Sequence, residues 1–383
     1  MPPSEAVVDA FWTTKSVIGD KLDSIIAWTP NDSEQGLITA HEFYNPSLLN
    51  PRSGVRDIRK YVEGQLPLQH LHFITASDVT LVSLSWCHAV MDGVGGAQLV
   101  AAWKREIAEP NHSDIYSDTD PATIFDFTQD VDISGGWHTP WWPSTYSFGF
   151  LKGMLGKAYE AHYHPLLNGS IYIPSAMLTR WRKAAAAEMH DGEYVSSNDL
   201  VAAWIFKYAW GVTYHADSDW NTLFTAVCAR GKHPALPISI ITNTAKSSAM
   251  PPIRTADLRK QSLAQTALSL RKSLRPFSDE EHVAKFVTEE YRRVKRWNGR
   301  PTSVPDGIHG ARVCGITSWA KQDMGNFTVR GTEALSCLTY NADRCVASVI
   351  DTADDWRVDY KMARRQWAAL EVQMAVENAH LRG

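Results

Sequence analysis

The sequence predicts a two-domain α/β protein, and three observations lead to this prediction. The chain has 383 residues, the length expected for two domains of roughly 150 residues or somewhat more each. Strand and helix patterns alternate in both halves, which favours mixed sheets flanked by helices. Between the halves, residues 109–147 are rich in Pro, Asp, Ser and Thr and show no hydrophobic period, so they form a functional loop or an interdomain crossover. We place one domain over residues 1–145 and the second over residues 146–383.

The first half contains a tandem pair of strands followed by a helix. Residues 70–76 and 79–86 alternate apolar and polar side chains and are separated by a two-residue turn. A polar, glycine-rich loop follows, and apolar residues at helical spacing then predict a helix over 97–107. Ahead of this pair we expect a short strand over 37–40 and a short helix over 55–63.

The second half continues with strands and longer helices. The helix over 200–210 is expected to be capped by the run Ser196-Ser197-Asn198-Asp199, whose side-chain oxygens accept hydrogen bonds from first-turn N–H groups. The remaining expected strands cover 170–174, 223–229, 313–319, 334–340 and 346–350, and the remaining helical segments cover 176–188, 255–296 and 364–381.

Composition excludes several classes of protein. Lys and Arg number 38 and Asp and Glu number 42, which gives a net charge of −4. Because no basic block stands out, we expect no nucleic-acid partner. Five cysteines without a C-x-x-C pair, no secretory signal and no apolar run of membrane-spanning length favour a reduced, cytoplasmic location without a transmembrane segment.

Other catalytic or metal patterns are absent or incomplete. His70 and His72, and likewise His162 and His164, are spaced as metal ligands on a strand are, but no third ligand is evident, so we expect no metal site. The sequence lacks the G-x-S-x-G of serine hydrolases and the Lys-Ser/Thr of a P-loop.

The candidate chemistry lies in W-C-H-A-V-M-D-G, residues 86–93. Histidine takes and returns a proton near neutral pH, and a strand that delivers His88 to a glycine-rich loop presents the imidazole at an edge. Asp92, four positions on, can brace the turn, and Gly93 permits a close approach of ligand to backbone. The alternative is that His88 is a satisfied histidine and that Asp92 caps the following helix.

This stretch resembles the H-x-x-x-D-G segment of the BAHD acyltransferases, a plant and fungal family that acylates specialised metabolites from acyl-CoA. Further matches follow in the family's order: residues 195–204 with its S-T-N-D helix start, 226–243 with its V-D-x-R … P-P-L-P … G-N stretch, 316–319 with its T-S-W strand, and 364–367 with its final helix. The resemblance covers roughly residues 60–370. It implies a short, fungal-type member with two chloramphenicol-acetyltransferase-like domains, each a mixed β-sheet flanked by helices, and an active site in a channel between them.

Two features depart from the family's pattern. Its D-F-G-W-G signature is represented by Asp323-Met324-Gly325-Asn326-Phe327, in which Asp323 and Gly325 match. In the family this motif is structural and lies away from the catalytic histidine. The segment ahead of His88 is also shorter than in most members.

The resemblance implies transfer of an acyl group, with acetyl expected, from acyl-CoA to a hydroxyl of a hydrophobic specialised metabolite. His88 is the implied general base, and direct transfer needs no covalent intermediate because both substrates bind together. Trp319 is implied as an oxyanion donor through its indole N–H, beside substrate-binding Thr317, although a core aromatic is the alternative for Trp319. Asp92 is implied to orient the site by pairing with Arg230, for which a surface charge is the alternative.

The remaining expectations concern ligands and partners. Ser197 and Asn243 match family positions near the channel. Acyl-CoA is expected as a co-substrate, with no permanently bound cofactor, and its phosphates are candidates for contacts with residues that otherwise read as solvated surface charges, namely Lys232, Lys246 and Arg254. The expected partners are the donor and a small hydroxylated acceptor, and the family suggests a monomer.

Two alternatives to this function stay open. A non-catalytic member of the same fold would bind a small molecule between its domains. A condensation-type enzyme would take its acyl group from a carrier-protein thioester, but Cys87 stands where condensation domains carry the first of two histidines.

Overall fold

The structure is a computed structural model of the whole chain. It describes residues 24–28, 39–41, 69–75, 80–86, 91–108, 126–132, 155, 163, 166–211, 216–240, 244–296, 312–320, 322, 328–329, 332–339, 346–351 and 355–382.

The chain divides into two compact units of interleaved sequence. Unit 1 consists of Met1–Ile115, Ile241–Asn243 and Lys321–Arg344, and unit 2 of Tyr116–Ile240, Thr244–Ala320 and Cys345–Gly383. This division differs from a single boundary at residue 145, because residues 321–344 come from the second half of the chain and join unit 1. The physical reason is strand pairing, since β11 (Thr332–Thr339) lies antiparallel to β1 (Ser24–Trp28).

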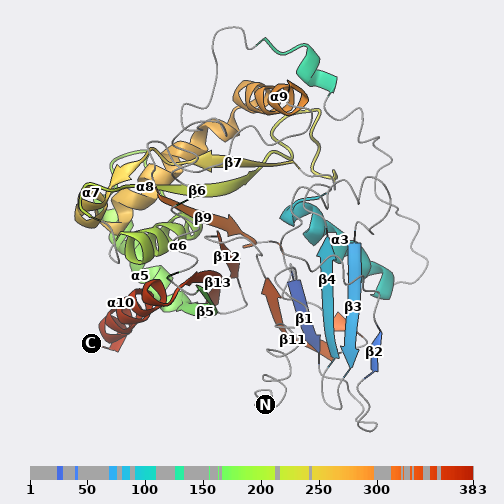
Figure 1. The fold of residues 1–383 in the computed structure, drawn as a ribbon, viewed down its shortest axis with the longest axis horizontal. Coiled ribbons are helices and arrows are strands. Elements are labelled where there is room, and N and C mark those ends of the chain that lie inside the picture. Colours follow the sequence, from blue (N-terminus) through green and yellow to red (C-terminus); the bar gives the residue numbers. More distant parts are fainter. Residues whose placement is uncertain are drawn as a thin grey trace. The chain divides into compact units, whose positions relative to one another are not determined.

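Unit 1 is built on an antiparallel sheet, which has six strands in the order β10-β11-β1-β4-β3-β2 within the described residues (Figure 1). Its other strands are β2 (Thr39–His41), β3 (Gln69–Thr75), β4 (Thr80–Trp86) and β10 (Thr328–Val329). Strands β3 and β4 form a hairpin in which Thr75 lies opposite Thr80. Helix α3 (Gly93–Ala108) follows β4 in the chain.

Unit 2 contains a mixed sheet with seven strands in the described part of the chain. Its path is β5-β13-β12-β9-β6-β7, and β8 pairs with β6 off this path. Strand β9 runs parallel to both of its neighbours, β6 and β12, and the other pairs are antiparallel. The strands are β5 (Leu166–Pro174), β6 (Trp220–Cys228), β7 (Ala245–Ala249), β8 (Ile253–Arg254), β9 (Arg312–Ser318), β12 (Val346–Asp351) and β13 (Asp355–Ala363).

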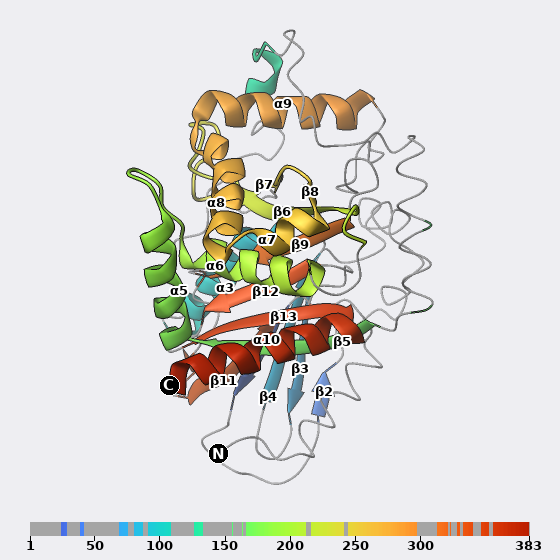
Figure 2. The same ribbon diagram turned by 90° about the vertical axis from the view of Figure 1, so that its left-hand side faces the viewer.

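Helices cover one face of this sheet (Figure 2). They are α5 (Ser175–Glu188), α6 (Ser197–Ile205) with its π-helical continuation η3 (Phe206–Trp210), α7 (Thr255–Lys260), α8 (Leu263–Leu274) and α10 (Arg364–Arg382). Alternate residues of the strands, such as Ile316, Val349 and Val358, pack with the fully buried Trp204 in one apolar core. Burial of this area is the main stabilising contribution to unit 2.

A second apolar cluster lies around helix α9 (Glu280–Arg296) and the 3-10 turn η4 (Arg275–Ser278). It includes residues of the turn after β6, and the short helix η2 (Asp126–Gln129) packs against α9. The buried members are Ala229, Leu236, Ile240, Phe277, Val283, Phe286 and Val287.

Most of the expected elements that fall within the described residues are present, with end shifts of a few residues. The strand expected over 37–40 overlaps β2 (Thr39–His41), whereas residues 37 and 38 and the helix expected over 55–63 lie outside the described residues. Five described strands are absent from the expected elements, namely β1, β7, β8, β10 and β13. Strand β13 nevertheless alternates apolar Trp356, Val358 and Tyr360 with charged residues, as a half-buried strand does.

Candidate active site

The H-x-x-x-D-G segment ends at the beginning of α3. Asp92 is 2% exposed, and its Oδ1 accepts a hydrogen bond from the Gly95 N–H at 2.9 Å. The Asp92 carbonyl O accepts the first helical bond, from the Gly96 N–H at 2.9 Å. Asp92 is therefore the N-cap of α3, which is the alternative role that the sequence leaves open for it, and Gly93 is the first helical residue. His88 lies outside the described residues.

The T-S-W segment occupies the end of the central strand β9. Ile316 belongs to the core on the helix-covered face, so Thr317 lies on the opposite face of the sheet, where it is half-buried. Trp319 follows the strand, is 7% exposed, and donates its backbone N–H to the Val349 carbonyl O at 2.7 Å. This bond extends the parallel pairing of β9 with β12 and fixes the backbone that carries the indole.

A charged pair lies on the same face of the sheet as Thr317. Arg357 and Asp359 alternate with the core residue Val358, and Asp359 is aligned with Ser348, which is aligned with Thr317. The side chain of Arg357 is 2% exposed, and its Nε lies 3.0 Å from Asp359 Oδ1. On the sheet face that carries Thr317, strand β13, which lies two strands away from β9, thus presents charged side chains.

Arg230 begins a tight turn after β6. It is 6% exposed, its Nε donates to the Ile240 carbonyl O at 2.5 Å, and a terminal N–H donates to Cys228 Sγ at 3.5 Å. Its burial contradicts the alternative of a surface charge. Gly231 has φ +66°, in the left-handed region that glycine favours, and its N–H donates to the Leu236 carbonyl O at 2.6 Å.

Ser197 is the first residue of α6, immediately after the N-cap Ser196. Ser196 and Asp199 form a capping box, in which Ser196 N–H donates to Asp199 Oδ2 at 2.7 Å and Asp199 N–H donates to Ser196 Oγ at 3.2 Å. This confirms the capping expected for the run 196–199.

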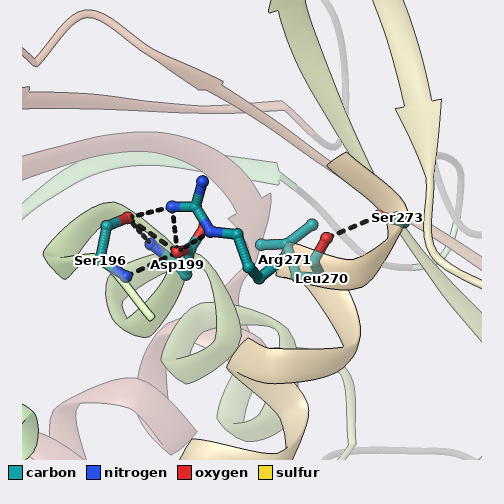
Figure 3. Close-up of polar contacts among 5 residues, drawn as sticks. All are labelled: Ser196, Asp199, Leu270, Arg271 and Ser273. Atoms are coloured by element: carbon teal, nitrogen blue, oxygen red, sulfur yellow. Dashed lines mark hydrogen bonds and ion pairs between the residues drawn. The ribbon is translucent and has the colours of Figure 1, made fainter. Parts of the chain in front are cut away.

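Arg271 of α8 closes this cap, which the sequence reasoning did not predict. Its Nε donates to Asp199 Oδ2 at 2.8 Å, a terminal N–H donates to Ser196 Oγ at 2.8 Å, and the guanidinium forms an ion pair with the Asp199 carboxylate (Figure 3). The Asp199 side chain is 1% exposed. Ser197 is therefore held at a rigid helix start.

The far end of the same helix is fixed by a buried lysine. Lys207 of η3 donates through Nζ to the carbonyl O atoms of Leu258 at 2.9 Å, Arg259 at 2.9 Å and Gln261 at 2.5 Å. These carbonyls close the C-terminal end of α7, where a positive charge is favoured. Burial lowers the pKa of Lys207 from its ordinary value of 10.5, whereas the three carbonyl acceptors favour the ammonium form.

The cations considered for an anionic ligand lie in different settings. Lys232 is exposed in the Arg230 turn, and Lys246 is half-buried on β7. Arg254 is exposed and its guanidinium carbon lies 5.0 Å from the centroid of the Trp220 ring. Each side chain has exposed surface that can meet solvent, as a surface charge does, or a phosphate.

The structure leaves part of the predicted constellation untested. His88, Asn243, Asp323 and Gly325 lie outside the described residues. Asp92 belongs to unit 1, whereas Arg230, Ser197, Thr317 and Trp319 belong to unit 2. The predicted pairing of Asp92 with Arg230 thus joins the two units and stays a prediction.

Two wider properties follow for the described part of the chain. It holds no cluster of three or more His, Cys, Asp or Glu side chains placed to bind a metal ion. None of its helices is both long enough and apolar enough to cross a bilayer.

Comparison with known proteins gives distant relatives by sequence. No family model matches the chain. The chain is 27% identical over 173 residues to the transcriptional regulator calD of Penicillium decumbens, an alignment that covers 41% of this chain and 32% of that protein. It is 21% identical over 298 residues to the acetyltransferase pyiB of Pyricularia grisea, covering 72% of this chain and 55% of that protein. The chain thus spans only about a third to a half of the length of these relatives.

Comparison of structures gives likeness over almost the whole chain. TRI101 of F. sporotrichioides, solved with coenzyme A and T-2, superposes with a TM-score of 0.61 at 10% identity and covers 93% of this chain and 94% of its own. Vinorine synthase superposes with a TM-score of 0.54 at 14% identity and covers 91% of this chain and 88% of its own. These likenesses confirm the predicted fold, which is the two-domain α/β fold of the BAHD acyltransferases.

Proposed function

We propose that this chain is a BAHD-type acyltransferase, which transfers an acetyl group from acetyl-CoA to a hydroxyl of a hydrophobic specialised metabolite. The observation that carries the proposal is the agreement of motif and fold. The H-x-x-x-D-G segment leads into α3 with Asp92 buried as its N-cap, in a chain whose fold matches a structure solved with coenzyme A and T-2. The likeness to the acetyltransferase pyiB supports the same reaction class.

The proposed reaction uses His88 as the general base. The imidazole takes the proton of the acceptor hydroxyl while its oxygen attacks the thioester carbonyl carbon. In the tetrahedral intermediate the new C–O bond is formed and the carbonyl oxygen carries the negative charge. The C–S bond then breaks, the carbonyl re-forms, and His88 returns its proton to the leaving thiolate, which gives the ester and free CoA.

The described residues have supporting roles in this proposal. Asp92 orients the loop that carries His88 by fixing the beginning of α3. Trp319 donates its indole N–H to the developing oxyanion, and its backbone is held in place by the bond to Val349. We assign Thr317 to a substrate contact on the sheet face opposite helices α5 to α8 and α10, and Arg230, which is 6% exposed, to the support of Asp92.

Coenzyme A is the proposed co-substrate rather than a resident cofactor. Its phosphates require cations that can meet solvent, and Lys232, Lys246 and Arg254 satisfy this condition in unit 2. Ser197, at the fixed start of α6, and Asn243 complete the proposed substrate contacts.

The test is acceptor-dependent thiol release. Purified protein is incubated with acetyl-CoA and a panel of hydroxylated terpenoids, polyketides and alkaloids, and free CoA thiol is measured. The protein's own five cysteines are subtracted with an enzyme-only blank. We expect release only when an acceptor is present, and its loss in His88→Ala.

Binding separates the open alternatives. Thermal shift with acetyl-CoA tests the donor site independently of turnover. Binding without turnover favours the non-catalytic member, and neither binding nor turnover contradicts the proposal. Thiol release that persists in His88→Ala excludes the proposed base. Transfer from an acyl carrier protein, but not from acetyl-CoA, favours the condensation reaction.

A further inference from the structure

A short part of the crossover segment 109–147 docks on unit 2. Residues 126–132 are described, and η2 within them lies beside α9, where it is visible as a short teal helix (Figures 1 and 2). Phe127 packs against the second apolar cluster, and Thr128 is 2% exposed. The crossover therefore has an anchored point within unit 2.

The most specific contact at this point is an aromatic stack. The rings of Phe127 and His233 lie with centroids 4.3 Å apart and planes 23° apart. His233 Nδ1 accepts a hydrogen bond from the Ala235 N–H at 3.1 Å, so the neutral ring carries its proton on Nε2. That Nε2 lies 3.9 Å from Glu280 Oε1 of α9. The imidazole is thus oriented by its hydrogen bond from Ala235 and presents a face to Phe127.

His233 belongs to the turn that fixes Arg230. The His233 carbonyl O accepts from the Leu236 N–H at 2.9 Å, and the Leu236 carbonyl O accepts from the Gly231 N–H at 2.6 Å. Arg230 in turn donates to Ile240 at the far end of the turn. A continuous series of contacts therefore connects Phe127, through His233 and the turn, to the backbone that carries the Arg230 guanidinium.

From this series we propose that Phe127 is a positioning residue: its stack on His233 holds the turn over residues 230–240, and with it Arg230, in the geometry that acyl transfer requires. The catalytic part of this proposal rests on the proposed function, whereas the order of the turn does not. It gives the crossover a role in the site beyond joining the two halves of the chain.

A second contact supports docking at this point. The pKa of Lys285 on α9 is raised, chiefly by its hydrogen bond to Glu281, and Asp132 just after η2 adds to the shift. Asp132 is thus one of the carboxylates whose charge favours the ammonium form of Lys285, after the larger effect of Glu281. The contact that holds residues 126–132 on unit 2 is the packing of Phe127 on the second apolar cluster.

The role is separable from general packing because Phe127 is only partly buried. Phe277 is 6% exposed in the same cluster, whereas Phe127 packs on its periphery. Loss of the Phe127 ring therefore removes the stack with a smaller loss of core area. Tyr208 is a matched control, since it is half-buried, packs on the periphery of the other cluster, and lies against the Trp204 ring with centroids 6.1 Å apart.

The experiment compares Phe127→Leu, Phe127→Trp and Tyr208→Leu in the full chain. Hydrogen exchange of the turn amides is measured together with kcat and KM for thiol release. We expect Phe127→Leu to speed exchange at Gly231 and Leu236 about three- to tenfold, as loss of an aromatic pair allows. We expect its kcat to fall by a similar factor with KM for acetyl-CoA unchanged, and Phe127→Trp to restore both.

The outcomes are decisive for each part. Unchanged exchange in Phe127→Leu overturns the proposal, as does failure of Phe127→Trp to restore protection. If Tyr208→Leu lost as much kcat as Phe127→Leu at an equal loss of stability, Phe127 would contribute only general packing, and the proposal would be overturned. If the wild-type chain transfers no acyl group, the proposed function fails, and the exchange of the turn amides still decides whether Phe127 holds the turn.

Discussion

Helices α3 and α6 both begin at a motif of the acyltransferase pattern, and both use a buried aspartate, but the two aspartates do different work. Asp92 is itself the N-cap of α3, with glycine at 93, 95 and 96 in the first turn. Asp199 lies three residues inside the start of α6, where it is bonded to Ser196 and paired with Arg271 of another helix.

In the proposed function, the start of α6 is chiefly structural, whereas the substrate approaches the start of α3. Each glycine in a helix costs about 0.5–1 kcal/mol relative to alanine, so three in one turn weaken α3 where it begins. What they provide is a backbone that a substrate can approach closely. Helix α6 has no glycine in its first turn and is tied at both ends, by Arg271 and by Lys207. We therefore expect changes at α6 to affect stability and changes at α3 to affect turnover.

The largest expected loss of stability follows from Arg271→Met. The Asp199 side chain is 1% exposed, so removing its partner leaves a buried carboxylate without a countercharge. Because Arg271 is 28% exposed, solvent screens the pair in part, and we expect a loss of about 3 kcal/mol, at the low end for broken buried pairs. Urea unfolding measures it as a fall in midpoint at constant m-value.

A double-mutant cycle tests the cause of that loss. Asp199→Ala removes the buried charge, and in Asp199→Ala/Arg271→Met the unpaired carboxylate is gone. We expect the double variant to be at least about 1 kcal/mol more stable than the sum of the two single losses predicts. Additive losses would mean that the pair contributes nothing as a pair.

The next effect is at the other end of the same helix. Lys207→Met keeps the length of the side chain and removes the ammonium, which leaves the carbonyls of Leu258, Arg259 and Gln261 without their shared donor. We expect a loss of about 2 kcal/mol, since buried acceptors lose their hydrogen bonds. The same urea titration measures it, with Lys183→Met on the exposed face of α5 as the control that should leave the midpoint unchanged. Equal midpoints for both variants would contradict the role of Lys207.

A smaller loss of stability, joined to a large loss of turnover, is expected for Asp92→Ala. The cap on the Gly95 N–H contributes about 1 kcal/mol to stability, and its loss also removes the support that the proposed function assigns to Asp92. Asp279 is the matched control because its Oδ1 caps α9 in the same way, accepting from the His282 N–H at 2.7 Å. Calorimetry should show a larger loss of stability in Asp92→Ala than in Asp279→Ala, because Asp92 is buried and Asp279 is exposed, and thiol release should fall in Asp92→Ala alone. Full turnover in Asp92→Ala would remove Asp92 from the site.

The sequence predicts local features of this molecule better than long-range ones. The β3–β4 hairpin and the cap at Ser196 depend on neighbouring residues, and both are found where the pattern places them. Pairing of β11 with β1 and of Arg271 with Asp199 joins residues far apart in the chain, and no periodicity specifies such partners. For the same reason the sequence does not distinguish a buried Arg230 from a surface charge, because its acceptor, the Ile240 carbonyl O, lies ten residues away in the chain.

The smallest expected effect is on the pH dependence of stability, and it concerns His282 and Asp279 at the beginning of α9. Burial lowers the pKa of His282 below 6.5, and the nearby Asp279 carboxylate offsets part of this shift. The folded chain therefore binds a proton less readily at this site than the unfolded chain does. The contribution of the neutral His282 ring to stability is therefore fully present above about pH 6.5 and is lost as the pH falls below it.

His282→Gln removes this titration, so we expect its Tm to fall by about 1 °C less than that of the wild type between pH 7.5 and 5.5. Asp279→Ala should steepen the slope of Tm against pH, because the carboxylate that favours protonated His282 is gone. If Tm changed with pH equally in His282→Gln and in the wild type, burial of the His282 ring would make no contribution to the pH dependence of stability.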